Sequence, residues 1–102
     1  MYEIMYGGQQ LWTSRAVAEA VMDYAAALMF RGGWDVVRLP VVIEGVATEA
    51  RLSLGPAVAL GIVALPGEPN PSLSAEGATV QNLRERMASL RSDDDSRRSN
   101  AG

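Results

Sequence analysis

The sequence contains no cysteine, no histidine and no lysine, and each absence excludes a class of chemistry. Without cysteine the chain can form neither a disulfide nor a zinc–thiolate site. Without histidine it lacks the commonest general base and metal ligand. Without lysine it can form no Schiff base, no phosphate-loop lysine and no adenylylated lysine. We therefore expect a protein that is not an enzyme and that holds no metal and no cofactor.

The charge balance argues against a polyanionic or membrane partner. The net charge is −3, and the basic residues, all arginine, are spread along the chain without a basic face. A phosphate backbone is therefore a poor partner, and nucleic-acid binding is disfavoured. The longest apolar run, residues 52–66, is interrupted by Ser53 and Pro56 and is shorter than the roughly 20 residues of a membrane span. The first residues lack the pattern of a signal peptide, so we expect a cytoplasmic protein.

The first third of the chain predicts a hairpin followed by a helix. Residues 2–12 alternate in polarity around Gly7-Gly8, a dipeptide that is typical of a tight turn. Residues 14–31 carry apolar side chains at spacings of three and four, with Met29 widening the stripe and Thr13 or Ser14 as the N-cap. The stripe consists of Val17, Val21, Tyr24 and Leu28.

Residues 34–65 predict three strands. Pro40 cannot donate a backbone hydrogen bond, so the first of these strands should lie at an edge of the sheet or contain a bulge. Glu44-Gly45 is a plausible turn, and residues 46–54 alternate well. The last strand, residues 57–65, is apolar on both faces, which is typical of a strand covered on both sides.

The remaining residues predict a linker, a helix and a tail. Residues 67–78 form a proline-rich linker after a core domain of residues 1–66. Residues 79–91 form an amphipathic helix, and residues 92–102 read as a disordered acidic and polar tail. The fold class is therefore α+β with the order ββαβββ, in which one long helix covers one face of a mostly antiparallel five-stranded sheet and a C-terminal amphipathic helix follows.

The two-sided apolar strand suggests a function. Its second face must be covered by the 79–91 helix or by a second copy of the chain. We therefore expect a non-catalytic protein–protein interaction or regulatory module that forms a homodimer or binds another protein. The expected interface residues lie on the last strand and on the final helix; they are Val58, Leu60, Ile62, Val80, Leu83, Met87 and Leu90.

A second reading assigns the protein a small-molecule or nucleic-acid ligand. Arg38 and Arg51 would supply positive charge, and aromatic side chains of the sheet would stack on the ligand. Those aromatic residues are Tyr2, Tyr6, Trp12 and Trp34. A two-carboxylate site at Glu44 and Glu49 is a weaker alternative, because both residues flank a turn and are expected to be solvated.

Several short motifs are similar to those of a known family. They are Met5-Tyr6-Gly7 in the first hairpin, a long helix ending at the basic residue Arg31, the segment Leu54-Gly55-Pro56-Ala57-Val58-Ala59-Leu60, and a proline-rich stretch before a final helix with Leu83 and Leu90. With these motifs the chain resembles a group of actinobacterial proteins of about this length and of unknown function, sometimes labelled ATP-dependent DNA ligase-like. The resemblance implies a fold and no activity, since nucleotidyl transfer needs a lysine nucleophile.

Overall fold

The computed structural model describes the backbone of residues 1–101 and the side chains of residues 1–92. The elements are β1 (Tyr2–Tyr6), β2 (Gln9–Thr13), α1 (Arg15–Phe30), β3 (Asp35–Ile43), β4 (Val46–Leu54), β5 (Leu60–Ala64) and α2 (Glu76–Ala101). The strands form one five-stranded sheet in the order β4-β3-β2-β1-β5, and every neighbouring pair is antiparallel. The α+β class and the order ββαβββ, followed by a C-terminal helix, are therefore confirmed.

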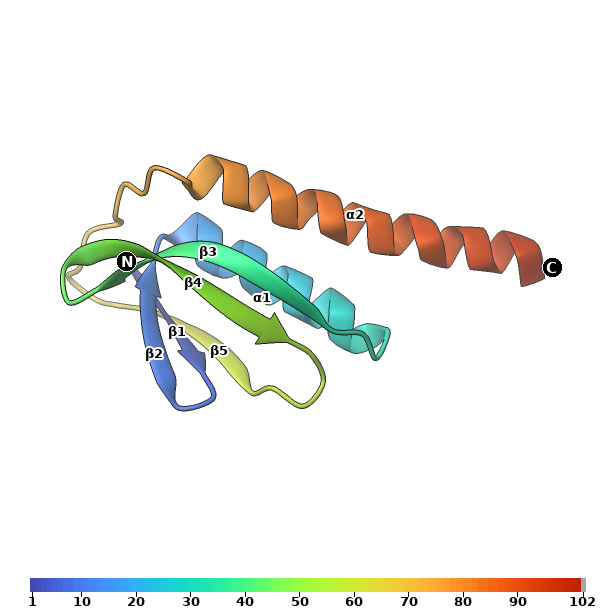
Figure 1. Ribbon diagram of the computed structural model, residues 1–102, viewed down its shortest axis with the longest axis horizontal. Coiled ribbons are helices and arrows are strands. Elements are labelled where there is room, and N and C mark those ends of the chain that lie inside the picture. Colours follow the sequence, from blue (N-terminus) through green and yellow to red (C-terminus); the bar gives the residue numbers. More distant parts are fainter. Residues whose placement is uncertain (102) are drawn as a thin grey trace.

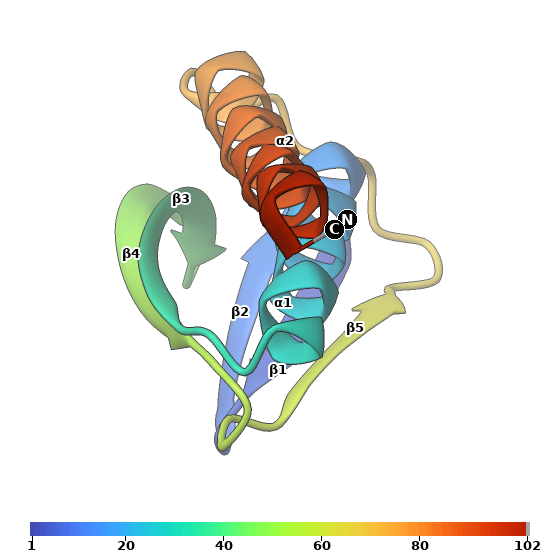
Figure 2. The same cartoon turned by 90° about the vertical axis from the view of Figure 1, so that its right-hand side faces the viewer.

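The sheet is strongly curved because its two halves are joined at one position. β3 pairs with β4 along its whole length, whereas in the described chain it pairs with β2 only where Val42 meets Trp12. The two halves therefore diverge from this corner, and the strands curve around α1 (Figure 2). The buried hydroxyl of Thr13 closes the corner by donating a 2.7 Å hydrogen bond to the carbonyl oxygen of Pro40.

The sequence predicted that the strand containing Pro40 lies at an edge of the sheet or contains a bulge, and both alternatives are wrong. β3 lies between β4 and β2, and its register with β4 continues through Pro40 without a bulge. The carbonyl oxygens of Val36 and Pro40 accept hydrogen bonds from the side chains of Arg86 and Thr13. These backbone positions therefore face away from β4, toward the sparsely paired β2 side, where the missing N–H of proline removes no ladder bond.

Tyr6 links the two halves of the sheet again at their far end. Its hydroxyl donates a 2.8 Å hydrogen bond to the carbonyl oxygen of Ser53 and accepts a 3.0 Å bond from the Ser53 N–H. Tyr6 lies on β1 and Ser53 on β4, which are not neighbours in the sheet. The curved sheet is thus held at both ends around a shared core.

The helix α1 begins and packs as its sequence predicts. The Ser14 Oγ accepts a hydrogen bond from the Val17 N–H at 3.3 Å and so caps the first turn. The predicted stripe is buried against side chains of the sheet that include Ile4, Val37 and Leu39. Met29 is a correction, because 57% of it is exposed; it lies beside the stripe and not within it.

The C-terminal helix lies on the same side of the sheet as α1. It packs along α1 and against β3 (Figures 1 and 2), and Leu83 joins the same buried cluster as Val17 and Ile4. The helix begins at Glu76, before the predicted residue 79, and it continues to Ala101 through residues expected to be a disordered tail. Only residue 102 of the predicted tail lies outside the described backbone.

The last strand is shorter and less covered than its sequence suggests. β5 spans Leu60–Ala64 at an edge of the sheet, and residues 57–59 belong to the loop before it. Leu60 and Ile62 pack against the core, whereas Val63, on the other face, is 41% exposed. Neither helix covers that second face, because both lie on the core side. The apolar residues at 57–59 therefore reflect a loop packed beside α1 and not a doubly covered strand.

Candidate functional site

The seven predicted interface residues divide into two groups in the structure. Leu83 is 2% exposed in the core, and Val80 and Ile62 pack against the core from its margin. These three side chains are used to hold the chain's own elements together. The other four line two surface grooves on either side of α1, Val58 and Leu60 on one side and Met87 and Leu90 on the other, and of these Leu60, Met87 and Leu90 also pack against the margin of the core.

An apolar ridge of α1 separates these grooves. It consists of Met22, Ala26, Met29 and Phe30, and we call it the α1 face. Met22, Ala26 and Phe30 follow one another at intervals of four, and Met29 lies three positions after Ala26, so the four side chains share one side of the helix. Phe30 is 97% exposed. Ala26 lines both grooves and leaves space for a close approach. No member of the α1 face is charged.

The groove between α1 and β5 is apolar throughout. It has a volume of about 280 Å³. Its walls are formed by Met22, Ala25, Ala26, Met29, Leu54, Gly55, Val58, Ala59 and Leu60. It holds no charged side chain, so it suits an aromatic or aliphatic group and not an anion or a cation.

The groove between α1 and α2 is wider and has a charged rim. Its volume is about 660 Å³, and Ala26, Ala27, Phe30, Met87 and Leu90 provide its apolar walls. At the rim, the Arg84 Nη1 lies 2.7 Å from the Asp23 Oδ2. The Arg31 Nη1 donates a 2.9 Å hydrogen bond to the carbonyl oxygen of Leu90, which fixes the end of α1 against α2.

A polar cluster joins α2 to α1 and to the start of β3. The Asp35 Oδ2 accepts hydrogen bonds from the Tyr24 hydroxyl at 2.6 Å and from the Arg86 Nη1 at 2.8 Å. Burial, together with the hydrogen bond to Asp35, raises the pKa of Tyr24 to about 12. Burial alone would raise the pKa of Asp35, but the hydrogen bonds from Tyr24 and the Val36 N–H and the charge of Arg86 lower it. Asp35 therefore stays ionised and ties three elements together.

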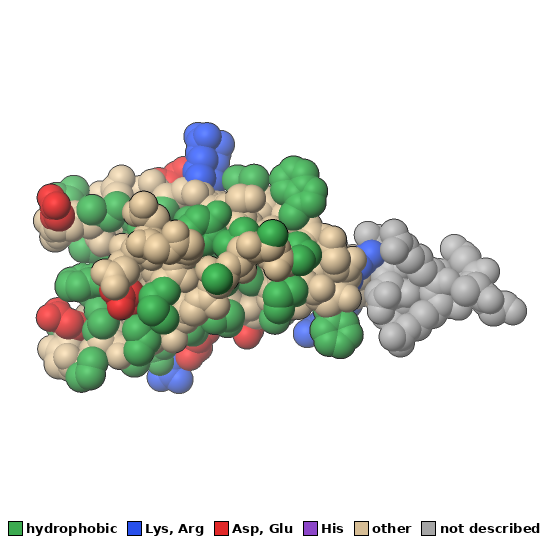
Figure 3. Space-filling model, turned by 90° about the horizontal axis from the view of Figure 1, so that it is seen from below, with side chains coloured by type: hydrophobic (Ala, Val, Ile, Leu, Met, Phe, Trp, Pro, Cys, Tyr) green, Lys and Arg blue, Asp and Glu red, His purple; other side chains and the backbone are tan. Residues whose placement is uncertain are grey.

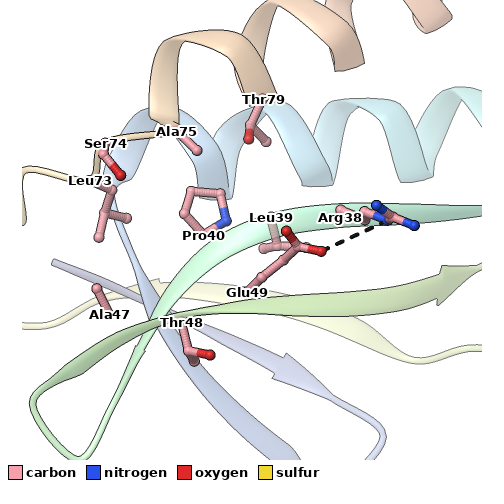
Figure 4. A pocket seen from close by; sticks show the side chains of 10 residues that line it. All are labelled: Arg38, Leu39, Pro40, Ala47, Thr48, Glu49, Leu73, Ser74, Ala75 and Thr79. Carbon is pink, nitrogen blue, oxygen red and sulfur yellow. Dashed lines mark ion pairs between the residues drawn. The ribbon is translucent and has the colours of Figure 1, made fainter.

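The structure brings together some but not all residues of the alternative hypothesis, since Arg38 and Arg51 lie opposite each other while the aromatic residues are divided. Tyr2 and Tyr6 pack against the core, whereas Trp12, which pairs with Glu3, lies on the opposite face of the sheet. Trp34 precedes β3 and is 73% exposed. Arg38 forms an ion pair with Glu49, whose Oε1 lies 3.8 Å from the Arg38 Nε, so part of its charge is neutralised. Figure 4 shows these two side chains facing one another on the surface of the β3–β4 hairpin, below the start of α2.

Phe30 is the residue of this surface that sequence reasoning missed. The signal was present, because Phe30 lies off the buried stripe that runs through Val17, Val21 and Leu28. A large aromatic side chain out of phase with the buried face of a helix indicates an exposed position.

Comparison with protein-family models, curated proteins and solved structures finds no match. Within the described residues, no helix is long and apolar enough to cross a membrane. In the same part of the chain, no three acidic side chains gather in a way that could hold a metal ion.

Proposed function

We propose that this protein is a non-catalytic interaction module that associates with a second copy of itself through the α1 face. The observation that carries the proposal is Phe30, an almost fully exposed aromatic side chain that lines the groove between α1 and α2, while its neighbour Met29 lines the uncharged groove between α1 and β5. Single exposed hydrophobic residues are ordinary on protein surfaces, but a contiguous apolar patch marks an interaction site.

The patch extends beyond Phe30. Met29 is 57% exposed, and Trp34, just after the helix, is 73% exposed. Seen from below, hydrophobic side chains are spread over the described surface, and two large ones project near the end from which α2 extends (Figure 3). A surface of this kind favours burial against another protein.

A two-fold contact requires a projecting group and a recess. The α1 face supplies the first, and the groove between α1 and β5 beside it supplies the second. In a two-fold dimer the same patch serves on both subunits, so a projecting residue of one must fit a recess of the other. Phe30 projects from the ridge, and the groove between α1 and β5 begins at Met29, its neighbour. The small side chain of Ala26, at the centre of the ridge, lets two copies of α1 approach closely.

The expected area is sufficient when the whole face takes part. Two phenylalanine side chains bury roughly 300–500 Å² together. A standard protein–protein interface buries roughly 1,200–2,000 Å² in total, so the rings supply about a quarter of it. Met22, Met29 and the groove walls, Val58 and Leu60 among them, supply the remainder.

The test is the solution mass of the protein and of the variant Phe30→Asp, measured by sedimentation over a range of concentrations. We expect the parent to dimerise and the variant to be monomeric, because a carboxylate in the apolar groove would lose its hydration without gaining a partner. Circular dichroism serves to check that the variant is folded, which is expected since Phe30 makes few contacts within the chain.

Val63→Asp is the matched control. It introduces the same charge at an exposed apolar position on the uncovered face of the sheet. We expect it to leave the dimer intact. A parent protein that is monomeric throughout, or a dimer that Val63→Asp disrupts and Phe30→Asp does not, would refute the α1 face as the site of association.

A further inference from the structure

A second surface, the free edge of β4, carries an inference of its own. β4 is an edge strand that pairs only with β3 in the described chain. The Ser53 N–H and C=O bond to Tyr6, so they point away from β3. Because bonding direction alternates along a strand, the backbone groups of Ala47, Glu49 and Arg51 point the same way, toward the open edge.

Between Val46 and Arg51 this edge lacks the usual devices that prevent pairing, whereas at Ser53 the Tyr6 hydroxyl occupies both outward backbone groups. Val46–Leu54 contains no proline, and its register with β3 is unbroken, so no bulge twists the edge away. Two charged residues, Glu49 and Arg51, do lie on it, and charges commonly block edge-to-edge contacts. On β4, however, the charges of Glu49 and Arg51 have opposite signs, and the two residues lie on either side of Ala50.

Among the described side chains, no carboxylate of the same chain balances the positive charge of Arg51. Arg38 lies directly opposite Arg51 in the ladder, and like charges at such positions repel each other. Glu49 forms its ion pair with Arg38, and among the described side chains Arg51 has no ion-pair partner. A carboxylate supplied from beyond the edge would relieve this repulsion.

We propose that β4 pairs antiparallel with β4 of a second copy, with the two-fold axis at Ala50. This register places Glu49 of each chain directly opposite Arg51 of the other, as a hydrogen-bonded pair whose side chains share one face. The two pairs of opposite charge form symmetrically, and each pair exchanges two backbone hydrogen bonds. The pairing covers residues 48–52 of each chain and stops before Ser53, whose outward backbone groups are held by Tyr6.

This contact uses a surface different from the α1 face and does not depend on it. Both contacts are two-fold, so a chain that used both would assemble beyond a dimer. The two contacts can therefore be tested apart, by blocking one while the other is measured. The test below is performed in the Phe30→Asp background for this reason.

The first experiment is disulfide trapping, which is clean because the chain has no cysteine of its own. Ala50→Cys places two thiols at the two-fold axis, where the Cα atoms of a non-hydrogen-bonded pair lie about 4.5 Å apart. That distance lies within the range of roughly 4.4–6.8 Å that a disulfide spans. We expect mild oxidation to yield a covalent dimer.

Thr48→Cys is the matched control. In the proposed register Thr48 and its counterpart are four residues out of step, about 13 Å apart along the strands, and they cannot form a bridge. A covalent dimer from Ala50→Cys alone supports the register. Equal cross-linking of the two variants, or none from Ala50→Cys, overturns the β4 contact whatever Phe30→Asp does by itself.

The second experiment reverses the charges. In the same background, Glu49→Arg or Arg51→Glu alone places like charges opposite one another, and we expect the dissociation constant to rise roughly tenfold or more. The double variant Glu49→Arg/Arg51→Glu restores opposite charges across the axis and should restore the affinity. Glu68→Arg, the same change in an exposed loop, should have no effect. A double variant no tighter than either single variant would overturn the proposal.

Discussion

The Tyr24 hydroxyl, on the first helix, donates a 2.6 Å hydrogen bond to the carboxylate of Asp35, the first residue of β3. The same oxygen of Asp35 accepts from Arg86 on the second helix. One carboxylate therefore fixes both helices to the sheet. Arg86 directly precedes Met87, which lines the groove between the helices.

Replacing Asp35 with asparagine should destabilise the fold. The amide keeps the shape of the carboxylate but loses the charge that Arg86 and Tyr24 bind. Since the side chains of Asp35 and Arg86 are about one-third exposed, we expect a loss of roughly 1–2 kcal/mol in the free energy of unfolding. Urea denaturation measures this loss. Glu85→Gln, at an exposed position on α2, serves as the control and should change the free energy by less than about 0.5 kcal/mol.

The acid limb of the stability curve should depend on Asp35. Its pKa is lowered in the folded protein from an ordinary value of 3.8. The carboxylate thus contributes stability that is present above 3.8 and is lost as the pH falls through the folded pKa. Melting temperatures measured below pH 5 should fall less steeply for Asp35→Asn than for the parent. Identical slopes for the two proteins would contradict this assignment.

The alkaline limb should depend on Tyr24. Its pKa is raised from 10.0 to about 12, because burial and the hydrogen bond to Asp35 favour the neutral phenol. The resulting stability is complete below pH 10 and is lost as the pH rises toward 12. In a titration followed by tyrosinate absorbance, Tyr24 should therefore give a late step. Tyr24→Phe should remove that late step, and a late step that persists in this variant would belong to another tyrosine.

Because Leu83 is buried in the core, shortening its side chain should strongly lower the free energy of unfolding. Leu83 is 2% exposed between the helices and the sheet, so Leu83→Ala should cost about 2–5 kcal/mol of unfolding free energy. Leu90→Ala, on the same stripe of α2 but only partly buried, should cost clearly less. Thermal or urea unfolding compares the two variants. A Leu83 variant as stable as the Leu90 variant would show that α2 does not share the core.

The hydroxyl of Thr13, at the corner between β2 and β3, should stabilise the fold through its hydrogen bond and not only through the packing of the side chain. Thr13→Val keeps the shape of the side chain but removes the donor to the Pro40 carbonyl oxygen, at a fully buried position. We expect a loss of about 1–3 kcal/mol, since a buried acceptor is left unpaired. Thr13→Ser retains the donor and should be less destabilising. Equal losses for serine and valine would point to packing and not to the hydrogen bond.

The sequence predicted the elements whose signals are local. Ser14 caps α1 because its side chain reaches the Val17 N–H only three residues away. Gly7-Gly8 and Glu44-Gly45 form turns with positive φ, and the alternation in residues 46–54 gives a strand that buries Leu52 and Leu54. Each of these features depends on residues within one turn or one strand.

The arrangement of the second helix could not be predicted in the same way. The stripe at Val80, Leu83, Met87 and Leu90 shows that the helix needs a partner, but any apolar surface satisfies it. The choice of α1 depends on pairs such as Arg86 with Asp35, which are 51 residues apart. The same limit applies to the candidate site, since Val58 and Met87 flank one helix only after the chain has folded.

The single pair between Trp12 and Val42 has a mechanical consequence. With so few backbone bonds across that seam, the β3–β4 hairpin is held to the rest of the molecule mainly by side chains, those of Thr13, Tyr6 and Arg86 among them. The seam is thus the place where we expect local opening to begin, because the ladder of the hairpin is complete and its core residues, Val37, Leu39 and Leu54 among them, are buried. Amide hydrogens at the seam will exchange with solvent before those inside the hairpin.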